Sequence, residues 1–295
     1  MRPQILPPDG VIVFLAALVL GLLWWTAFFE PRFYKFRKRR VRLSKKIPKP
    51  LNILHLSDIH FSGENPFLES FFDKLGEETH DFIFLTGDIF DSPEGIPQSV
   101  RNLKKLKAHF GIFSVLGNHD YFDYHLWDVF FHSFPGQGRP LRKQPDQDFQ
   151  KALESAGVRV LRNQTLRVRF GEVSALIHGL DDPTTGRADV GATFKGSEGT
   201  GEVRFLLSHS VDAMLRVQKN EIDVCFSGHS HGGQVRLPFF GALITHTTLG
   251  RKFAGGLHSF KGTFCSISQG VGTSRFFGIR FLCRPEAVTL VVEGA

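Results

Sequence analysis

The chain has 295 residues, enough for one large domain or two small ones, and its hydrophobic content of 42% is ordinary for a folded protein. The formal net charge is +7, but ten of the 36 Lys and Arg residues and only one acid lie between residues 30 and 50. That segment carries +9 and residues 51–295 carry −2, which argues against a nucleic-acid-binding domain in the larger part.

An uncharged apolar run, VIVFLAALVLGLLWWTAFF, covers residues 11–29 after a short tail at 1–10. A helix of this length spans roughly 28 Å, close to the hydrocarbon thickness of about 30 Å. Trp24 and Trp25 lie near one end, where aromatic residues favour the membrane interface. A cleaved signal peptide has basic residues before its apolar run, whereas here they follow it, so we expect an uncleaved transmembrane anchor.

Residues 30–50 form a basic juxtamembrane segment. Such clusters stay on the cytoplasmic side, so we expect a single-pass protein of the inner (cytoplasmic) membrane with residues 51–295 in the cytoplasm. Phe33, Tyr34 and Phe36 are interleaved with the basic residues. The segment could therefore lie on anionic headgroups, or it could be only a stop signal.

The pattern after Leu51 predicts an α/β fold. Apolar runs typical of buried strands cover 51–57, 81–87 and 111–117, and helices are expected at about 67–78 and 95–109. Strands alternating with helices favour βαβ units and a parallel sheet. Beyond about residue 158 the runs are mostly strand-like. Two sheets packed face to face and flanked by helices fit this order. Cys225, Cys265 and Cys283 have no C-x-x-C spacing and indicate reduced core thiols.

Five polar motifs each follow the end of an apolar run. They are Asp58-x-His60, Gly87-Asp88-x-x-Asp91, Gly117-Asn118-His119-Asp120, His209, and Gly228-His229-x-His231. Parallel sheets present functional side chains just past the carboxyl ends of their strands, so we expect these motifs to converge. A single Asp or Asn at a strand end is usually a turn residue. The five together predict a two-metal phosphoesterase site, because imidazole and carboxylate suit Zn, Fe or Mn, and oxygen donors also admit Mg.

The motif set resembles the calcineurin-like metallophosphoesterase superfamily. The stretches LHLSDIHF, GHSHGGQVRLP and SQGVGTSRF are similar in particular to its membrane-associated bacterial phosphodiesterases. The resemblance covers nearly all of residues 51–295. It implies a catalytic domain built as a four-layer α-β-β-α sandwich, preceded here by one transmembrane helix, with two divalent metal ions. Mn²⁺ is the metal we expect, and Fe, Zn and Mg remain alternatives.

The resemblance also implies a role for each motif residue. The first metal would be held by Asp58, His60 and His231, the second by Asn118, His209 and His229, with Asp88 bridging the two. His119 would act at the leaving oxygen as general acid or charge stabiliser, and Asp91 would orient it. Asp120 is expected to be only a turn residue. The glycines that precede Asp88, Asn118 and His229 suit tight turns at strand ends.

An aromatic-rich insert is expected at about residues 121–150. Phe130 and Phe131 within it could contact a lipid substrate beside a basic rim of Arg139 and Arg142. The alternative is a helix whose aromatic face packs on the core. Together with the anchor, the insert favours the lipid bilayer as a partner and a lipid-linked phosphate or nucleotide diphosphate as substrate.

Within the resembling families, the best-matched activity is hydrolysis of the diphosphate of UDP-2,3-diacylglucosamine, which yields UMP and diacylglucosamine 1-phosphate in lipid A synthesis. The alternative is a membrane-associated phosphodiesterase of other or broad substrate. Protein Ser/Thr phosphatases of the superfamily carry Arg after the residue matching Asp91, where this chain has Ser92. A nuclease would need a basic channel. A non-catalytic scaffold is disfavoured because every motif residue is present, and the sequence indicates no particular protein partner.

Overall fold

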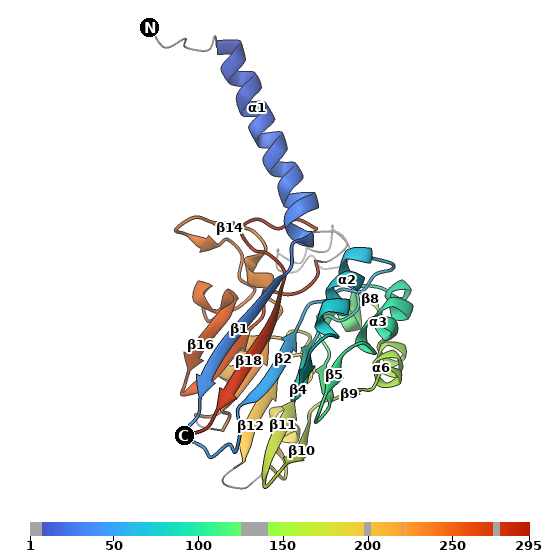
Figure 1. Cartoon of the computed structure of the whole chain (residues 1–295), viewed down its shortest axis with the longest axis vertical. Helices are drawn as coiled ribbons and strands as arrows, with labels where there is room; N and C mark the ends of the chain where they lie inside the picture. Colours follow the sequence, from blue (N-terminus) through green and yellow to red (C-terminus); the bar gives the residue numbers. More distant parts are fainter. Residues whose placement is uncertain (1–7, 125–140, 198–201, 220, 274–277) are drawn as a thin grey trace.

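The computed structural model describes residues 8–124, 141–197, 202–219, 221–273 and 278–295, and Figure 1 shows their arrangement. The α-helices are α1 (Pro8–Trp24), α2 (Pro66–Leu75), α3 (Ile96–Leu103), α4 (Asn118–Tyr121), α6 (Asp146–Ser155) and α7 (Val190–Phe194). Shorter helical turns are η1 (Trp25–Phe29), η2 (Glu30–Arg32), η3 (Pro93–Gly95), η4 (Val211–Leu215), η5 (His231–Gly233) and η6 (Arg251–Ala254).

Two six-stranded sheets form the body of the domain. The first has the order β1 (Lys35–Arg42), β18 (Glu286–Glu293), β2 (Leu51–Leu56), β4 (Phe82–Thr86), β6 (Ile112–Val115), β9 (Val158–Val160). The second has the order β10 (Gln164–Phe170), β11 (Val173–Gly179), β12 (Val203–Leu207), β13 (Val224–Ser227), β17 (Thr263–Ile267), β16 (Gly256–Phe260). Three small ladders join β3 (Thr79–His80) to β5 (Lys107–Ala108), β7 (Phe122–Asp123) to β8 (Arg142–Lys143), and β14 (Arg236–Leu237) to β15 (Gly241–Ala242).

The central strands of each sheet are parallel. β2, β4, β6 and β9 run together in the first sheet, and β11, β12, β13 and β17 do so in the second. Only β18 against β2, β10 against β11 and β16 against β17 are antiparallel pairs within these two sheets. The predicted α/β class with two packed sheets is confirmed.

The side chains of β4 point alternately to the two faces of the first sheet, and both faces are packed with apolar residues. Its sequence Phe-Ile-Phe-Leu-Thr sends successive side chains to opposite faces. Phe82 and Phe84 face the second sheet, where the ring of Phe84 lies 4.9 Å from that of Phe226 and 5.6 Å from that of Phe205. Six buried Phe residues fill the space between the sheets, where large flat side chains bury much apolar area.

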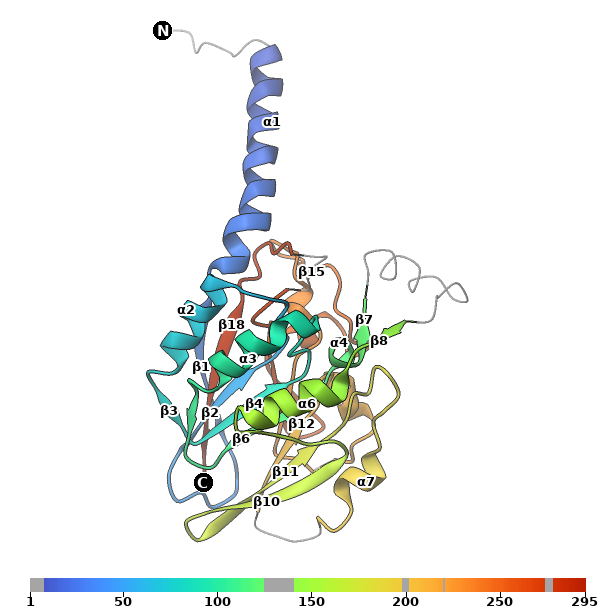
Figure 2. The same ribbon diagram turned by 90° about the vertical axis from the view of Figure 1, so that its right-hand side faces the viewer.

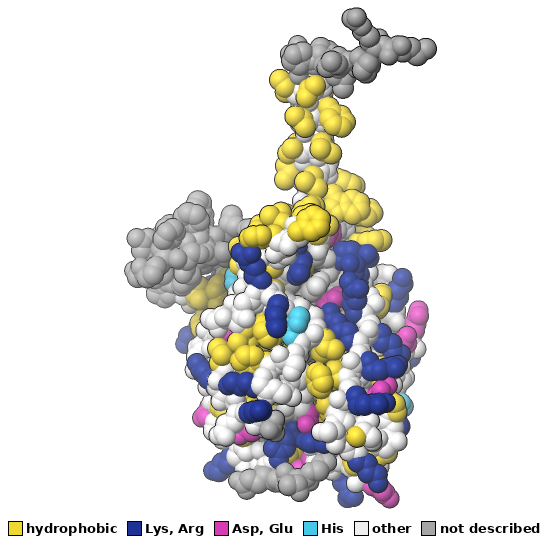
Figure 3. All heavy atoms as spheres, turned by 90° about the vertical axis from the view of Figure 1, so that its left-hand side faces the viewer, with side chains coloured by type: hydrophobic (Ala, Val, Ile, Leu, Met, Phe, Trp, Pro, Cys, Tyr) yellow, Lys and Arg dark blue, Asp and Glu magenta, His cyan; other side chains and the backbone are white. Residues whose placement is uncertain are grey.

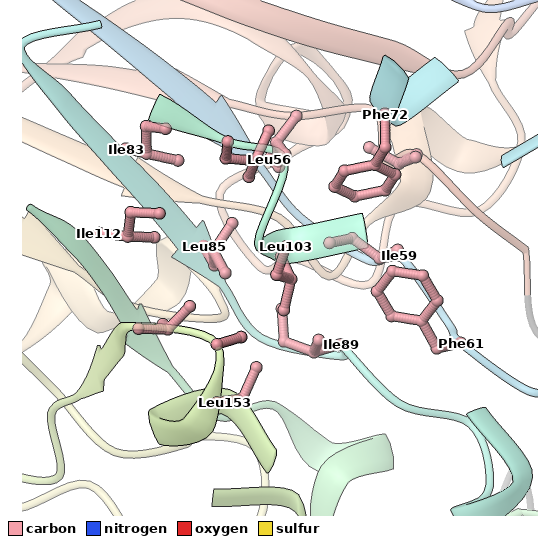
Figure 4. Close-up of a cluster of buried hydrophobic side chains, with 14 of the residues drawn as sticks. Leu56, Ile59, Phe61, Phe72, Ile83, Leu85, Ile89, Leu103, Ile112 and Leu153 are labelled. Carbon is pink, nitrogen blue, oxygen red and sulfur yellow. The ribbon is translucent and has the colours of Figure 1, made fainter. Parts of the chain in front are cut away.

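Ile83 and Leu85 face the other way, toward α2, α3 and α6, and Figure 4 shows this cluster. The three helices cover the outer face of the first sheet (Figure 2). On the outer face of the second sheet, short elements such as α7, η4 and η6 supply the covering residues. α3 ends at Leu103, well before the predicted end at residue 109, because Lys107 and Ala108 pair with β3 instead.

The chain begins with a helical stretch at Gly10–Arg32, 23 residues, that is long and apolar enough to span a membrane. It projects from the domain as an isolated column (Figure 1). The domain itself begins before the expected boundary at residue 51, because β1 pairs with β18 along its whole length. Much of the basic juxtamembrane segment is therefore an edge strand of the first sheet.

This placement also bears on the expectation that the basic segment could lie on anionic headgroups. A strand of eight residues spans about 26 Å, and β1 runs from the foot of the helix to the far end of the sheet (Figure 1). The segment as a whole therefore does not lie flat on headgroups at the foot of the helix. Its charges line an exposed sheet edge, where Arg40 pairs with Glu293 at 3.1 Å, and such charges oppose pairing with another strand.

Strand direction places the motifs at the helix end of the domain. β1 starts at the foot of the helix, β18 is parallel to it, and β2 is antiparallel to β18. β2 and its parallel neighbours therefore point their carboxyl ends toward the helix.

Candidate metal centre

In the loops that carry the motifs, successive side chains still point in opposite directions, as they do in the strands before them. After β2, Ile59 and Phe61 are buried in the core, while Asp58 and His60 turn the opposite way. After β4, Ile89 and Phe90 occupy the same core beside α3. Figure 4 shows Ile59, Phe61 and Ile89 pointing into this cluster. The apolar residues of each motif thus anchor the polar ones at the strand ends.

The first group of candidate ligands comes from β2, β4 and β13. His60 Nε2 lies 3.3 Å from His231 Nε2, and His231 Nε2 lies 3.4 Å from Asp58 Oδ1. Asp88 Oδ2 approaches His60 Nε2 at 3.9 Å. All four side chains place one ligand atom within 4.8 Å of the others, close enough to surround one cation.

Asp88 also belongs to the second group. Its Oδ2 lies 3.2 Å from His209 Nε2, which in turn lies 3.1 Å from both His229 Nδ1 and Asn118 Oδ1. His209 Nδ1 donates to the carbonyl oxygen of Thr86 at 2.9 Å, which leaves its Nε2 facing the group. All seven predicted ligands are therefore brought together, and Asp88 is the member common to both groups.

The chemistry of this set fits divalent cations. Burial, together with the neighbouring His209 and His60, lowers the pKa of His229 and of His231 well below the usual value, so both imidazoles are neutral. Burial opposes ionisation of Asp88, but His209 outweighs it and lowers the pKa of that carboxyl. Neutral imidazoles and an ionised carboxylate are the forms that bind metal. The residues present thus fit a two-cation site.

A proton occupies this centre in the absence of metal. Burial alone would lower the pKa of His209, but the charge of Asp88 and its hydrogen bond raise it to about 10. The protonated imidazole then supplies the positive charge that the buried carboxylate requires. Cation binding must displace this proton, so it is coupled to proton release.

His119 sits at the edge of the centre and is its most exposed candidate catalytic residue. Its Nδ1 lies 3.0 Å from Asp91 Oδ1, which also approaches His60 Nδ1 at 3.4 Å. Burial would raise the pKa of Asp91, but the hydrogen bond from His119 and the nearby imidazole of His60 outweigh it and lower that pKa well below the usual value. Asp91 is therefore an ionised acceptor that orients His119 and lies beside His60.

Backbone strain is concentrated at this centre. Five predicted ligands adopt positive φ, with values of 49° to 69°, although none is glycine. They are Asp58, His60, Asp88, His229 and His231. Bulky residues rarely occupy this region, and strain of this kind persists where surrounding structure enforces it. Gly117 is required nearby, because a Cβ there would collide with Asp88 Oδ1 and His209 Nδ1.

Asp120 has a larger role than the predicted turn residue. Its Oδ1 accepts from the backbone N–H groups of Ile89 at 3.0 Å and Phe90 at 2.9 Å, and its Oδ2 accepts from Gly117 at 2.8 Å. The side chain is completely buried. Burial and the charge of Asp88 raise its pKa to about 7. Asp120 thus ties the loop of Asp88 to the loop of Asn118.

A polar cavity of about 260 Å³ opens beside the centre. Its lining includes His60 and Gln98, together with Ala27, Pro31 and Arg32 from the foot of the apolar helix. Gln98 is 1% exposed, and its Oε1 has no partner among the described residues. Of the candidate ligands, His60 alone lines the described part of this cavity, and its imidazole side chain is 0% exposed.

The calcineurin-like phosphoesterase family model matches residues 51–233, more than half of the chain. The chain belongs to this family. It is therefore a hydrolase, and the metal dependence of the family agrees with the clustered His and Asp side chains.

Three relatives illustrate the range of similarity among these phosphoesterases. The uncharacterized metallophosphoesterase YkoQ of Bacillus subtilis is 30% identical, with 81% of this chain and 82% of YkoQ covered. The phosphodiesterase YaeI of Escherichia coli is 27% identical, with 88% and 89% covered. The UDP-2,3-diacylglucosamine pyrophosphatase LpxG of Chlamydia muridarum is 29% identical, with 94% and 95% covered.

Of the four predicted substrate contacts, the described residues include Arg142 alone. Arg142 lies in β8 and is exposed. Arg139, Phe130 and Phe131 fall outside the described residues, as does much of the aromatic-rich insert. The described end of the insert is helix α6, whose Phe149 packs on Phe90 with ring centroids 4.3 Å apart. That part of the insert is core.

Sequence reasoning missed the loop that supports this phosphoesterase centre from the C-terminal side. Gly270 and Gly272 approach Asp58 and Ile59 so closely that a Cβ at Gly272 would collide with the Ile59 carbonyl. Arg280, fully buried, donates to the carbonyls of Gly272 at 2.7 Å and Gln269 at 2.9 Å. A lone arginine in a loop gives no sequence signal for such a role. The cysteines were predicted correctly, since all three are free and buried.

Proposed function

We propose that this chain is a membrane-anchored, two-metal phosphohydrolase that cleaves the diphosphate of UDP-2,3-diacylglucosamine. The products would be UMP and diacylglucosamine 1-phosphate. The observation that carries the proposal is the clustering of the candidate ligands at the end of the domain that joins the apolar helix. A diphosphate carried by a lipid at the membrane surface could reach the metal centre from that side.

The metal ligands in this proposal are the seven residues of the two groups. Asp58, His60 and His231 would hold the first cation, Asn118, His209 and His229 would hold the second, and Asp88 would be shared by both. When bound, such a pair of divalent cations supplies Lewis acidity and a water of lowered pKa. We favour Mn²⁺, because the set mixes imidazole nitrogens with carboxylate and amide oxygens.

The remaining chemistry falls to His119 and Asp91. His119 would donate a proton to the leaving oxygen or stabilise its charge. Asp91 accepts from His119 Nδ1 and so leaves Nε2 as the nitrogen that faces substrate. The main-chain N–H of His119 donates to Asp88 Oδ1 at 2.8 Å, which ties the proposed acid to the bridging ligand.

The proposed location is the inner membrane, with the catalytic domain in the cytoplasm. The apolar helix is the span, and the positive charges of residues 30–50 follow it directly. Clusters of this kind remain on the cytoplasmic side. UDP-linked substrates made in the cytoplasm would then be accessible to the domain.

A phosphodiesterase of other or broad substrate is the second candidate. The similarity to YaeI, whose name states only phosphodiesterase, favours it. The similarity to LpxG extends over more of both chains, which favours the first candidate.

The test uses full-length protein in detergent micelles with UDP-2,3-diacylglucosamine and Mn²⁺, with and without a chelator, and measures UMP. Chelator-sensitive UMP release, lost in His119→Ala, supports the first candidate. Hydrolysis of a generic phosphodiester without UMP release would reject it in favour of the second. Turnover that persists after complete removal of metal would reject both.

A further inference from the structure

Apolar side chains gather on the end of the domain from which the helix emerges (Figure 3). Within the described chain, two loops there carry seven exposed hydrophobic residues, with exposures from 38% to 112%. We call this set the apolar shelf; its members are Leu237, Phe239, Phe240, Leu243, Ile244, Ile279 and Leu282. Soluble domains rarely expose so many neighbouring large hydrophobic side chains without a partner surface.

The two loops of the shelf are held together by backbone hydrogen bonds. Arg236 N–H donates to the Phe281 carbonyl at 2.9 Å, and Phe281 N–H donates to the Gln234 carbonyl at 2.9 Å. The β14–β15 ladder closes the first loop into a hairpin. The shelf is therefore one surface whose two loops are hydrogen-bonded to each other.

The shelf is also joined to the foot of the apolar helix. Arg280 N–H donates to the Thr26 carbonyl at 2.9 Å, and Cys283 N–H donates to Glu30 Oε1 at 2.6 Å. Glu30 is buried and its Oε2 accepts from Trp25 Nε1 at 3.1 Å. The loop of Ile279 and Leu282 is thus continuous with the apolar surface of the helix.

Basic side chains accompany the apolar ones. The guanidinium of Arg251 lies 3.9 Å from the ring centroid of Phe240, and that of Arg284 lies 3.8 Å from the ring centroid of Phe33. Hydrophobic residues with Arg beside them suit the boundary between acyl chains and anionic headgroups.

We propose that the apolar shelf inserts into the membrane leaflet beside the apolar helix and forms a second contact between the domain and the lipid bilayer. This inference rests on the membrane anchoring in the proposed function. The bilayer is the occupant because the shelf is continuous with the spanning helix and lies at the same end of the domain.

The consequence for the site follows from what lies beneath the shelf. A Cβ at Gly233, two residues after His231, would collide with Ala242 of the hairpin. Cys283 Sγ donates to the His231 carbonyl at 3.3 Å. The loop of His229 and His231 is therefore packed directly under the shelf, so an acylated substrate would approach the centre from the leaflet side.

The experiment uses the full chain in vesicles of phosphatidylcholine and phosphatidylglycerol. All three native cysteines are buried, so a single introduced cysteine can be labelled selectively with an environment-sensitive dye. Phe239→Cys reports on the shelf and Phe14→Cys on the spanning helix. Leu215→Cys is the matched control, because it is exposed and its carbonyl contacts Lys261 at the opposite end of the domain.

Quenching by nitroxide-bearing lipid then separates the outcomes. We expect the Phe239 label to be quenched at least about fivefold more than the Leu215 label. A quenched Phe14 label with an unquenched Phe239 label overturns the shelf but leaves the anchor. An unquenched Phe14 label overturns the proposed anchoring and the shelf that rests on it. A Phe239 label shielded from water but not quenched by lipid identifies a protein contact and also overturns the inference.

A functional readout avoids the label. Phe239→Ser with Ile244→Ser should lower hydrolysis of a vesicle-borne lipid diphosphate at least about tenfold and leave hydrolysis of a water-soluble chromogenic diester unchanged. Leu215→Ser should alter neither rate. Equal loss on both substrates would mean that the hairpin only supports the His231 loop, and the inference would fail.

Discussion

Replacement of Asp120 by alanine removes the carboxylate that joins two ligand loops. Three backbone N–H groups lose their acceptor, those of Ile89, Phe90 and Gly117. Because Asp120 is fully buried, water does not replace the carboxylate without a rearrangement of the loops. Asp88 and Asn118 lie on these loops, so both stability and metal affinity should fall.

The magnitude follows from the number of orphaned donors. A buried donor left without a partner costs about 1–3 kcal/mol, so three donors cost at least about 3 kcal/mol. For a domain of this size, 1 kcal/mol shifts Tm by about 2–4 °C, which predicts a drop of roughly 6–12 °C for Asp120→Ala. Loss of a group that orients metal ligands weakens metal affinity by about 10–100-fold.

The Asp120→Asn variant keeps the shape of the side chain and one acceptor oxygen, so comparing it with Asp120→Ala shows how much the hydrogen bonds contribute. The amide oxygen can still accept from Ile89 and Phe90, whereas the amide NH₂ meets the N–H of Gly117. Only the N–H of Gly117 is then left without an acceptor, instead of three N–H groups. One such unpaired donor costs about 1–3 kcal/mol, and each kcal/mol lowers Tm by roughly 2–4 °C. Thermal unfolding by circular dichroism and calorimetric titration with Mn²⁺ measure the two effects on full-length protein. Asp148→Ala, an exposed acid of α6, is the control for charge removal.

The reasoning is refuted if Asp120→Ala melts within about 2 °C of the wild type and binds Mn²⁺ equally well. Asp120 would then be only the turn residue that its sequence position suggests. An Asn variant as damaged as the Ala variant would show that charge, and not the count of acceptors, matters at this position.

Three further predictions concern the acid, the pH and the edge strand. His119→Ala should lower turnover about 10²–10⁴-fold while metal content, measured by elemental analysis, stays unchanged. Because the pKa of His209 rises from 6.5 to about 10 on folding, metal-free protein gains stability below pH 6.5 and should lose it as pH rises toward 10. Metal-loaded protein should lack this decline in a denaturant titration, since the cation replaces the proton. Deletion of residues 1–50 should lower Tm more than deletion of residues 1–24, because only the former removes β1; equal melting would contradict this.

The metal-ligand candidates could be found from sequence because each motif is local. Asp58 with His60, and His229 with His231, are separated by one residue and follow apolar runs whose alternation predicts the strand before them. The parallel arrangement of those strands then places the motifs at one edge. Short apolar runs and the order of strand-like and helical segments also predicted the two-sheet core, since both are visible within a few neighbouring residues.

The remaining features depend on contacts between distant segments, which no local pattern reports. β1 looks like a charged linker, and only pairing with β18 more than 240 residues later makes it a strand. Asp120 and Arg280 have short-range sequence neighbours typical of turns, yet each is buried by loops from elsewhere in the chain. The apolar shelf likewise exists only because two loops are hydrogen-bonded beside the foot of the helix. The sequence determined which groups can perform the chemistry, and the tertiary structure decided what holds them and which surface they face, because burial and hydrogen bonding are properties of the folded chain.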